Sequence, residues 1–143
     1  MEKLLISACL LGVSCRYDGK SKPMENIEKL MEKYELIPVC AEIFGGLPTP
    51  RVPAEICGEK VITSDGRDVT GEYEKGAAEV LRLGKLFGAK KALLKERSPS
   101  CGSGIIHNGK FDGGLVPGFG KTAKLLIAEG FEVFGESQTD KLI

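Results

Sequence analysis

Short apolar runs alternate with stretches of helical periodicity along the whole chain. The runs are compact and bounded by Gly, Pro or polar residues, which is typical of buried strands. They lie at residues 3–8, 35–39, 90–95 and 131–134. Between them, apolar residues recur every three or four positions, as they do in amphipathic helices. This spacing predicts helices at 25–34, 70–87 and 122–129.

The alternation of strand and helix predicts one small α/β domain. Parallel strands need helical crossovers, so this order favours a three-layer, Rossmann-like arrangement around a mainly parallel sheet of about four strands. Asn108-Gly109 is a strong two-residue turn signal and adds a β-hairpin. We expect a single α/β domain over residues 1–136 and a frayed C-terminal tail over residues 137–143.

Two further features concern the middle of the chain. Thr70 is expected to cap the start of the longest helix, and Gly88 to end it. Residues 44–66 are rich in Gly and Pro, which predicts a long loop. A loop of this length in so small a domain is usually functional.

The balance of charged residues argues against functions that require binding to DNA or to a membrane. Lys and Arg number 20, Asp and Glu also number 20, and no run of basic residues concentrates positive charge. We therefore expect no DNA partner and no membrane partner. The apolar stretch at the N-terminus is too short for a signal peptide or a membrane span, which favours a cytoplasmic location. We expect a monomer or weak dimer whose partner is a small molecule.

Three of the five cysteines follow predicted strands: Cys9, Cys40 and Cys101. The carboxyl ends of parallel strands meet at one edge of a sheet, so these thiols are expected to lie close together. Three thiols at one place favour a metal or iron–sulfur site over chance. Cys15 and Cys57 are interpreted as small hydrophobic side chains packed in the interior.

The ligand set distinguishes the kinds of metal site. Structural zinc needs four ligands, whereas the chain has no Cys-x-x-Cys pair and one histidine, His107. Three cysteines fit a cuboidal 4Fe-4S cluster with one iron free of a protein ligand. Spacing alone leaves a zinc-binding or cluster-binding module open. A metal-free cysteine nucleophile lacks support, because His107 lies beside the hairpin turn, where we expect a surface residue.

Three oxygen-bearing side chains accompany the cysteines. Glu42 lies two residues beyond Cys40, and Ser98 and Ser100 precede Cys101. Glu42 is a candidate general base acting on water next to a cluster. The serines are candidates for hydrogen bonds to a substrate or to a sulfur. An exposed glutamate and two serines that cap a turn remain the alternative interpretation.

Four distinctive motifs occur in order along the chain. They are Ser7-Ala-Cys-Leu-Leu-Gly12 with Cys15-Arg-Tyr-Asp-Gly19, Pro38-Val-Cys-Ala-Glu42 with Gly45-Gly-Leu-Pro, Pro50-Arg-Val-Pro-Ala-Glu55, and Lys95-Glu-Arg-Ser-Pro-Ser-Cys-Gly102. Together these motifs resemble the thiouracil desulfidase (TudS)-like family of small bacterial proteins. The resemblance extends over nearly the whole chain, and it is more specific to the family than to one substrate.

The resemblance implies roles for these residues. Cys9, Cys40 and Cys101 match the three cysteines that hold a 4Fe-4S cluster, and Glu42 matches the acidic residue of catalysis. The catalytic serine falls on Ser98 or Ser100, and the resemblance does not decide between them. It further implies a hydrolytic desulfidase, not a redox enzyme, that converts thiolated pyrimidines such as thiouracil to uracil and hydrosulfide with Lewis-acid assistance. The alternative is a non-enzymatic cluster-binding or metal-binding module for sensing or sulfur delivery.

Overall fold

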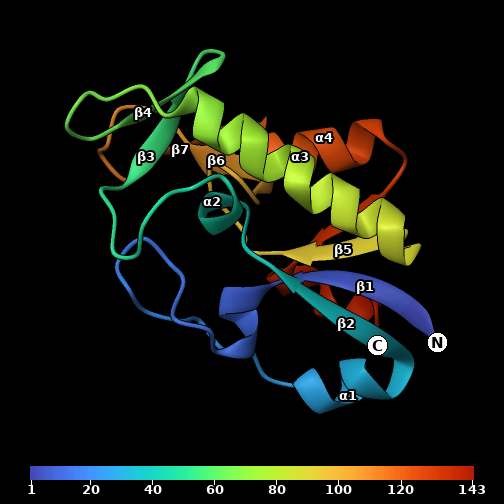
Figure 1. Cartoon of the computed structure of the whole chain (residues 1–143). Helices are drawn as coiled ribbons and strands as arrows, with labels where there is room; N and C mark the ends of the chain where they lie inside the picture. Colours follow the sequence, from blue (N-terminus) through green and yellow to red (C-terminus); the bar gives the residue numbers. More distant parts are fainter.

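A four-stranded parallel sheet forms the centre of the molecule. A computed structural model describes residues 1–143, and in it the strands are ordered β2-β1-β5-β8, with every neighbouring pair parallel (Figure 1). The predicted parallel sheet is confirmed, and each predicted apolar run lies within one or two residues of a strand. The strands are β1 (Glu2–Ser7), β2 (Tyr34–Val39), β5 (Lys91–Leu94) and β8 (Glu132–Gly135).

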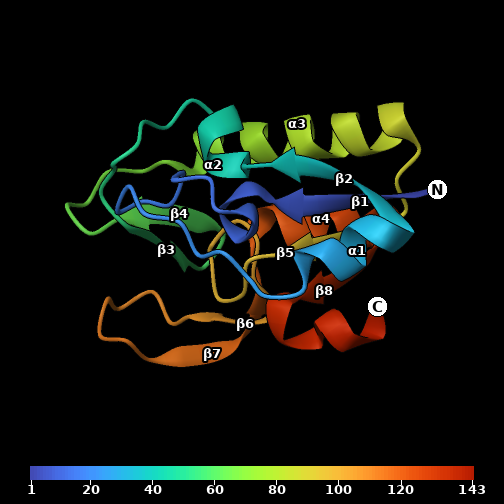
Figure 2. The ribbon, with the colours of Figure 1, turned by 90° about the horizontal axis from the view of Figure 1, so that it is seen from below.

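Helical layers cover both faces of this sheet. Leu5, Ala92 and Leu94 face the cluster that includes side chains of α3 (Thr70–Phe87) and α4 (Lys121–Ala128). Their neighbours in sequence point the other way, toward α1 (Ile27–Lys33) and the C-terminal 3-10 helix η2 (Glu136–Lys141). Side chains of a strand alternate between its faces, so consecutive apolar residues serve both layers. Figure 2 shows α3 and η2 on opposite sides of the sheet. No helix combines the length and the apolar character that crossing a membrane requires.

The start of α3 differs from the prediction. Thr70 is the first helical residue rather than the cap, and its backbone N–H donates to Asp68 Oδ1 at 2.9 Å. The Thr70 hydroxyl instead accepts the backbone N–H of Val61 at 2.9 Å, which joins the helix to the neighbouring hairpin. Gly88 ends the helix in the left-handed conformation, as predicted.

The predicted loop over residues 44–66 is wrong in its second half. An antiparallel hairpin forms there from β3 (Ala54–Cys57) and β4 (Lys60–Thr63). Cys57 pairs with Lys60, so two residues make the turn, and Gly58 supplies the positive φ that this turn requires. The prolines before the hairpin favoured a loop prediction for the whole segment, so its two short strands were not predicted.

The second hairpin was predicted, but its turn is longer than Asn108-Gly109. Strands β6 (Ser103–His107) and β7 (Leu115–Phe119) are joined by residues 108–114. Glu55 Oε1 accepts the backbone N–H groups of Gly109 at 2.9 Å and Phe111 at 3.2 Å. A buried carboxylate on β3 therefore shapes this loop, and the local Asn-Gly signal does not determine it.

The C-terminal tail, predicted to fray over residues 137–143, is ordered. Residues Glu136–Lys141 form η2, and Leu142 is fully buried within the core cluster that also contains Leu4, Ile6 and Leu93. The polar sequence before Leu142 gives no periodic signal. Burial of this one side chain attaches the tail to the sheet.

The short helix α2 (Ala41–Phe44), which was not predicted, lies directly against α3 (Figure 1). A Cβ atom at Gly76 of α3 would overlap the backbone carbonyl of Ala41. Only glycine permits this approach, because the atom it would meet belongs to the backbone and has no rotamer to change. The position of α2 therefore depends on Gly76.

Leu142→Ala should lower the free energy of unfolding by about 2–5 kcal/mol, because it removes a fully buried leucine side chain. Urea unfolding followed by circular dichroism measures this change. Ile143→Ala is the matched control, since Ile143 is exposed and its loss should change stability by less than about 0.5 kcal/mol. Equal effects of the two substitutions would contradict a docked tail.

Gly76→Ala should destabilise the protein by about 1–3 kcal/mol, because the new methyl group displaces α2. Gly71→Ala in the same helix is the control. A Cβ atom there meets nothing within 4 Å, so alanine should be neutral or slightly stabilising. Thermal unfolding of both variants gives the comparison, and a neutral Gly76→Ala would contradict the tight α2–α3 contact.

Candidate functional site

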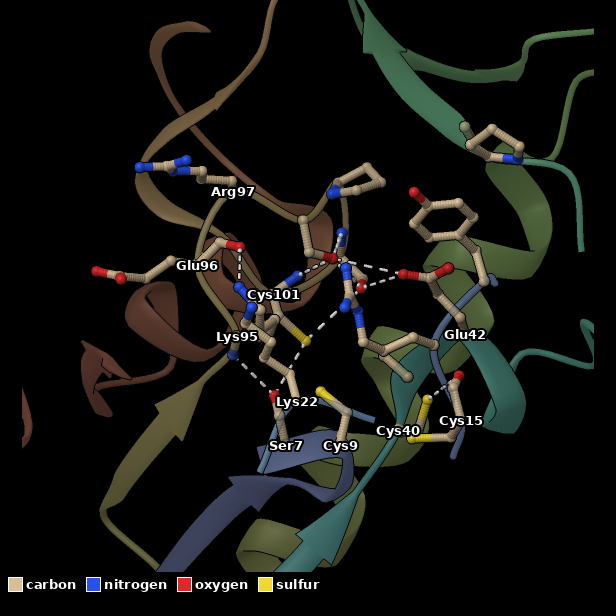
Figure 3. A pocket seen from close by; sticks show the side chains of 18 of the residues that line it. Ser7, Cys9, Cys15, Lys22, Cys40, Glu42, Lys95, Glu96, Arg97 and Cys101 are labelled. Carbon is tan, nitrogen blue, oxygen red and sulfur yellow. Dashed lines mark hydrogen bonds between the residues drawn. The ribbon is translucent and has the colours of Figure 1, made fainter. Parts of the chain in front are cut away.

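The carboxyl ends of three neighbouring strands open into one cavity of about 650 Å³. Cys9 lies in the short 3-10 helix η1 (Ala8–Leu11) that follows β1, and Cys40 lies between β2 and α2. Cys101 lies in the loop between β5 and β6. All three line the cavity, so the structure brings together the thiols that the sequence places 31 and 61 residues apart (Figure 3).

The loop before Cys101 is held by its own serine and by β1. Ser98 Oγ accepts the backbone N–H groups of Ser100 at 3.1 Å and Cys101 at 3.2 Å. Ser7 at the end of β1 accepts the backbone N–H of Lys95 at 2.9 Å, and its hydroxyl donates to Cys101 Sγ at 3.5 Å. Two serines thus fix the sulfur of Cys101 relative to the sheet.

The carboxylate of Glu42 is surrounded by hydrogen-bond donors. Its Oε2 accepts the hydroxyl of Ser100 at 2.9 Å and that of Ser98 at 3.4 Å. Its Oε1 accepts the hydroxyl of Tyr73 at 2.9 Å and the Nε–H of Arg51 at 2.9 Å. Only 14% of the Glu42 side chain is exposed, so these four bonds replace the hydration that it loses.

Ser100 connects this carboxylate to a thiol. Its hydroxyl lies 2.9 Å from Glu42 Oε2 and 3.6 Å from Cys101 Sγ. Ser100 is almost completely buried, and Ser98 lies 2.9 Å away through the two hydroxyl oxygens. Glu42 and the two serines predicted from the sequence therefore form one network with Cys101.

Burial raises the pKa of three of the thiols that line the cavity. Burial raises the pKa of Cys101 to about 12, although hydrogen bonds from Ser7 and Ser100 act in the opposite direction. Burial also raises the pKa of Cys9 to about 12, with further increases from the neighbouring cysteines. The pKa of Cys15, again through burial first, is about 11. Several soft donors that repel one another as thiolates are a set that a cationic metal centre would stabilise.

The cysteines that line the cavity do not form a site for a single metal ion. No three Cys, His, Asp or Glu side chains converge closely enough to share one metal ion. The ligands of one zinc ion each lie about 2.0–2.3 Å from it, so they must converge. A cuboidal cluster distributes its cysteine ligands over several irons, so its ligands need not meet at one point.

Two further residues differ in burial from what the sequence suggested, and a third, Cys15, does not. His107 was expected at the surface, but it is half-buried and lines the cavity, and its Nδ1 atom is buried without a hydrogen-bond partner. Cys57 was interpreted as a packed hydrophobic side chain, but it is exposed on β3. Cys15 is buried as expected, and it also lines the cavity beside Cys40. His107 lies directly before the 108–114 loop, which is longer than predicted, and Cys57 lies in the β3–β4 hairpin, which was not predicted.

Arg51 and Tyr73 were not recognised as site residues from the sequence. Arg51 stands in a proline-rich segment, and Tyr73 lies in the first turns of α3. The one available signal was the Pro50-Arg51-Val-Pro motif, in which a cation is flanked by residues that fix the backbone.

Three comparisons relate nearly the whole chain to known proteins. A family model described as 2-thiouracil desulfurase matches residues 4–138. The protein YbbK of Bacillus subtilis (strain 168), described as uncharacterized, is 41% identical over 150 residues, which cover 98% of this chain and 99% of YbbK. A solved structure of the [4Fe-4S]-dependent thiouracil desulfidase TudS superimposes with a TM-score of 0.95 at 49% identity, covering 99% of this chain and 95% of that one. The chain therefore belongs to the 2-thiouracil desulfurase family.

Proposed function

We propose that this protein is a hydrolytic desulfidase that replaces the sulfur of a thiolated pyrimidine, such as thiouracil, with oxygen from water. The family and the 49% identical [4Fe-4S]-dependent homologue support the activity. One water and one thiocarbonyl group give a carbonyl group and hydrosulfide, so no electron is gained or lost. The cavity volume lies within the range of about 300–1,000 Å³ that is usual for small-molecule sites.

Cys9, Cys40 and Cys101 would hold the 4Fe-4S cluster. This proposal is supported by their common cavity and by the hydroxyl groups that stand within reach of Cys101 Sγ. When bound, the cluster supplies a Lewis-acidic iron without a protein ligand, suited to the soft sulfur of the substrate. Cys15 lines the same cavity and has no role in this proposal.

One observation supports the catalytic assignment above all. The Ser100 hydroxyl contacts both the Glu42 carboxylate and the Cys101 sulfur, which joins a general base to the thiol side of the cavity. In this proposal Glu42 takes one proton from the attacking water, and the second water proton goes to the sulfur, which leaves as hydrosulfide. Once Glu42 carries that proton, the Ser100 hydroxyl donates to the negative charge that develops on the thiocarbonyl group or to the pyrimidine ring.

Of the two serines, Ser100 is the one we assign to catalysis. Its hydroxyl is closer to Glu42 Oε2 than that of Ser98, at 2.9 Å against 3.4 Å. Ser98 Oγ is already the acceptor of two backbone N–H groups, which is the role of a residue that shapes a turn.

Anaerobic reconstitution with iron and sulfide tests the cluster. The unaltered chain should bind about four irons, and Cys9→Ser, Cys40→Ser and Cys101→Ser should each lose most of that iron together with the visible absorption. Cys57→Ser is the matched control, because Cys57 is exposed and does not line the cavity. Iron bound equally by the Cys101→Ser variant would contradict the ligand assignment.

Glu42→Gln and Ser100→Ala should both keep the iron content and lower the rate of uracil formation from thiouracil. For Glu42→Gln the rate should fall by about 10²–10⁴-fold. Glutamine preserves the shape of the side chain but cannot take a proton from water. Uracil and sulfide are both quantified, so that hydrolysis is distinguished from simple loss of thiouracil. An iron-loaded chain that never forms uracil would favour the cluster-binding module, and unchanged turnover of Glu42→Gln would contradict the base assignment.

A further inference from the structure

The guanidinium group of Arg51 is fully engaged inside the protein. Only 6% of its side chain is exposed, and each of its nitrogens donates to an oxygen. Its Nε bonds to Glu42 Oε1 at 2.9 Å, and its Nη2 bonds to the backbone carbonyl of Cys15 at 2.9 Å. Its Nη1 has two acceptors, Thr49 Oγ1 at 3.1 Å and the carbonyl of Pro48 at 3.2 Å. Because each nitrogen of this planar guanidinium group has a hydrogen-bond acceptor, the group is held in one orientation.

Tyr73 approaches the same oxygen of Glu42 from the other side. It is buried in α3 within a small apolar cluster that includes Val61 and Val69, and its hydroxyl donates to Glu42 Oε1 at 2.9 Å. Burial, followed by the negative charge of Glu42, raises the pKa of Tyr73 far above its ordinary value. The phenol therefore remains a hydrogen-bond donor.

The two oxygens of Glu42 consequently have different surroundings. Oε1 accepts one charged and one neutral donor, which occupies the positions of its two lone pairs. Oε2 accepts the Ser100 hydroxyl at 2.9 Å, on the side of the cavity where Cys101 lies (Figure 3). The Ser98 hydroxyl is 3.4 Å from Oε2 but 2.9 Å from Ser100 Oγ, so it can donate to Ser100 and leave one lone pair of Oε2 open. The carboxylate cannot exchange its oxygens by rotation without breaking both bonds at Oε1.

We propose that Arg51 and Tyr73 are positioning residues that hold Oε1 and thereby make Oε2 the atom of Glu42 that accepts the proton. This inference rests on the proposed function and adds which atom acts and what fixes it. Arg51 also links Glu42 to the Cys15 carbonyl, which lies 3.9 Å from Cys40 Sγ. Arg51 thus fixes the position of the Glu42 carboxylate relative to the Cys15 backbone, which lies beside the proposed cluster ligand Cys40.

A simpler role for Arg51 would be to neutralise the charge of Glu42. Lysine would then serve equally well, since it carries the same charge as a point rather than a fork. Tyr73 offers an independent test, because its replacement by phenylalanine changes no charge and removes one hydroxyl group. The two roles therefore predict different results for conservative variants.

Tyr73→Phe should retain the iron content and visible spectrum of the reconstituted protein, lower kcat about tenfold and leave KM within a factor of about two. Tyr34→Phe is the matched control, because Tyr34 is equally buried but packs in the cluster on the other face of the sheet. Unchanged kcat in Tyr73→Phe would overturn the role of Tyr73.

Arg51→Ala should lower kcat about a hundredfold, because a misplaced base loses its alignment. Guanidinium chloride at a non-denaturing concentration should restore part of the activity, whereas sodium chloride at equal ionic strength should not. Arg51→Lys should be nearly as defective as Arg51→Ala. Arg67→Ala serves as the control, since Arg67 is exposed and its one ion pair is with Asp65 on the surface. Full activity in Arg51→Lys would overturn the positioning role and leave charge neutralisation.

A readout without turnover separates this inference from the proposed function. Crystal structures of Tyr73→Phe and Arg51→Lys should show the Glu42 carboxylate rotated away from Ser100, while the fold is unchanged. If the unaltered protein binds iron but does not act on thiouracil, the proposed function fails, and these structures still test the positioning. A carboxylate left in place in both variants would overturn the inference even in an active enzyme.

Discussion

A carboxylate withdrawn from water must find donors, and the need to surround Glu42 organises the whole cavity. Its donors come from three separate segments: the proline-rich stretch with Arg51, the helix with Tyr73, and the loop with Ser98 and Ser100. An unpaired charge at this depth would cost several kcal/mol, whereas the surrounded charge is a fixed acceptor. The same bonds that make burial possible also give the group a single orientation.

The hydrogen bonds continue from the carboxylate into the thiols. The Ser100 hydroxyl contacts Cys101 Sγ. The Ser7 hydroxyl on β1 donates to the same sulfur and accepts the backbone N–H of Lys95. Bonds of this kind strengthen one another in a medium of low polarity, and a partly broken network is costly. The hydrogen bonds of the cavity therefore form one network, which connects Tyr73 on α3 to Ser7 at the end of β1.

The sequence predicted well whatever depends on local periodicity. The four parallel strands, α3 and the gathering of Cys9, Cys40 and Cys101 all follow from apolar spacing together with the geometry of a parallel sheet. This geometry decides where a residue after a strand must lie, so the proximity of the three thiols needed no knowledge of their contacts.

What escaped prediction depends on contacts between distant segments. Tyr73 meets Glu42 across 31 residues, and Glu55 shapes the turn at Gly109 across 54. No pattern within a window of a dozen residues records such a pair. The ordered tail was not predicted for the same reason. Its position depends on one leucine, Leu142, which packs against residues near the N-terminus such as Leu4 and Ile6.

The pairing of the first strand with β5 has a consequence for biosynthesis. Ser7 and Cys101 meet across 94 residues, and β1 joins β5 only after most of the chain has been made. Contacts so distant in sequence form late, because a long loop must close first. The nascent chain on the ribosome thus exposes Cys9 and Cys40 well before Cys101 exists. A metal centre that uses all three thiols can therefore be completed only after Cys101 has been synthesised.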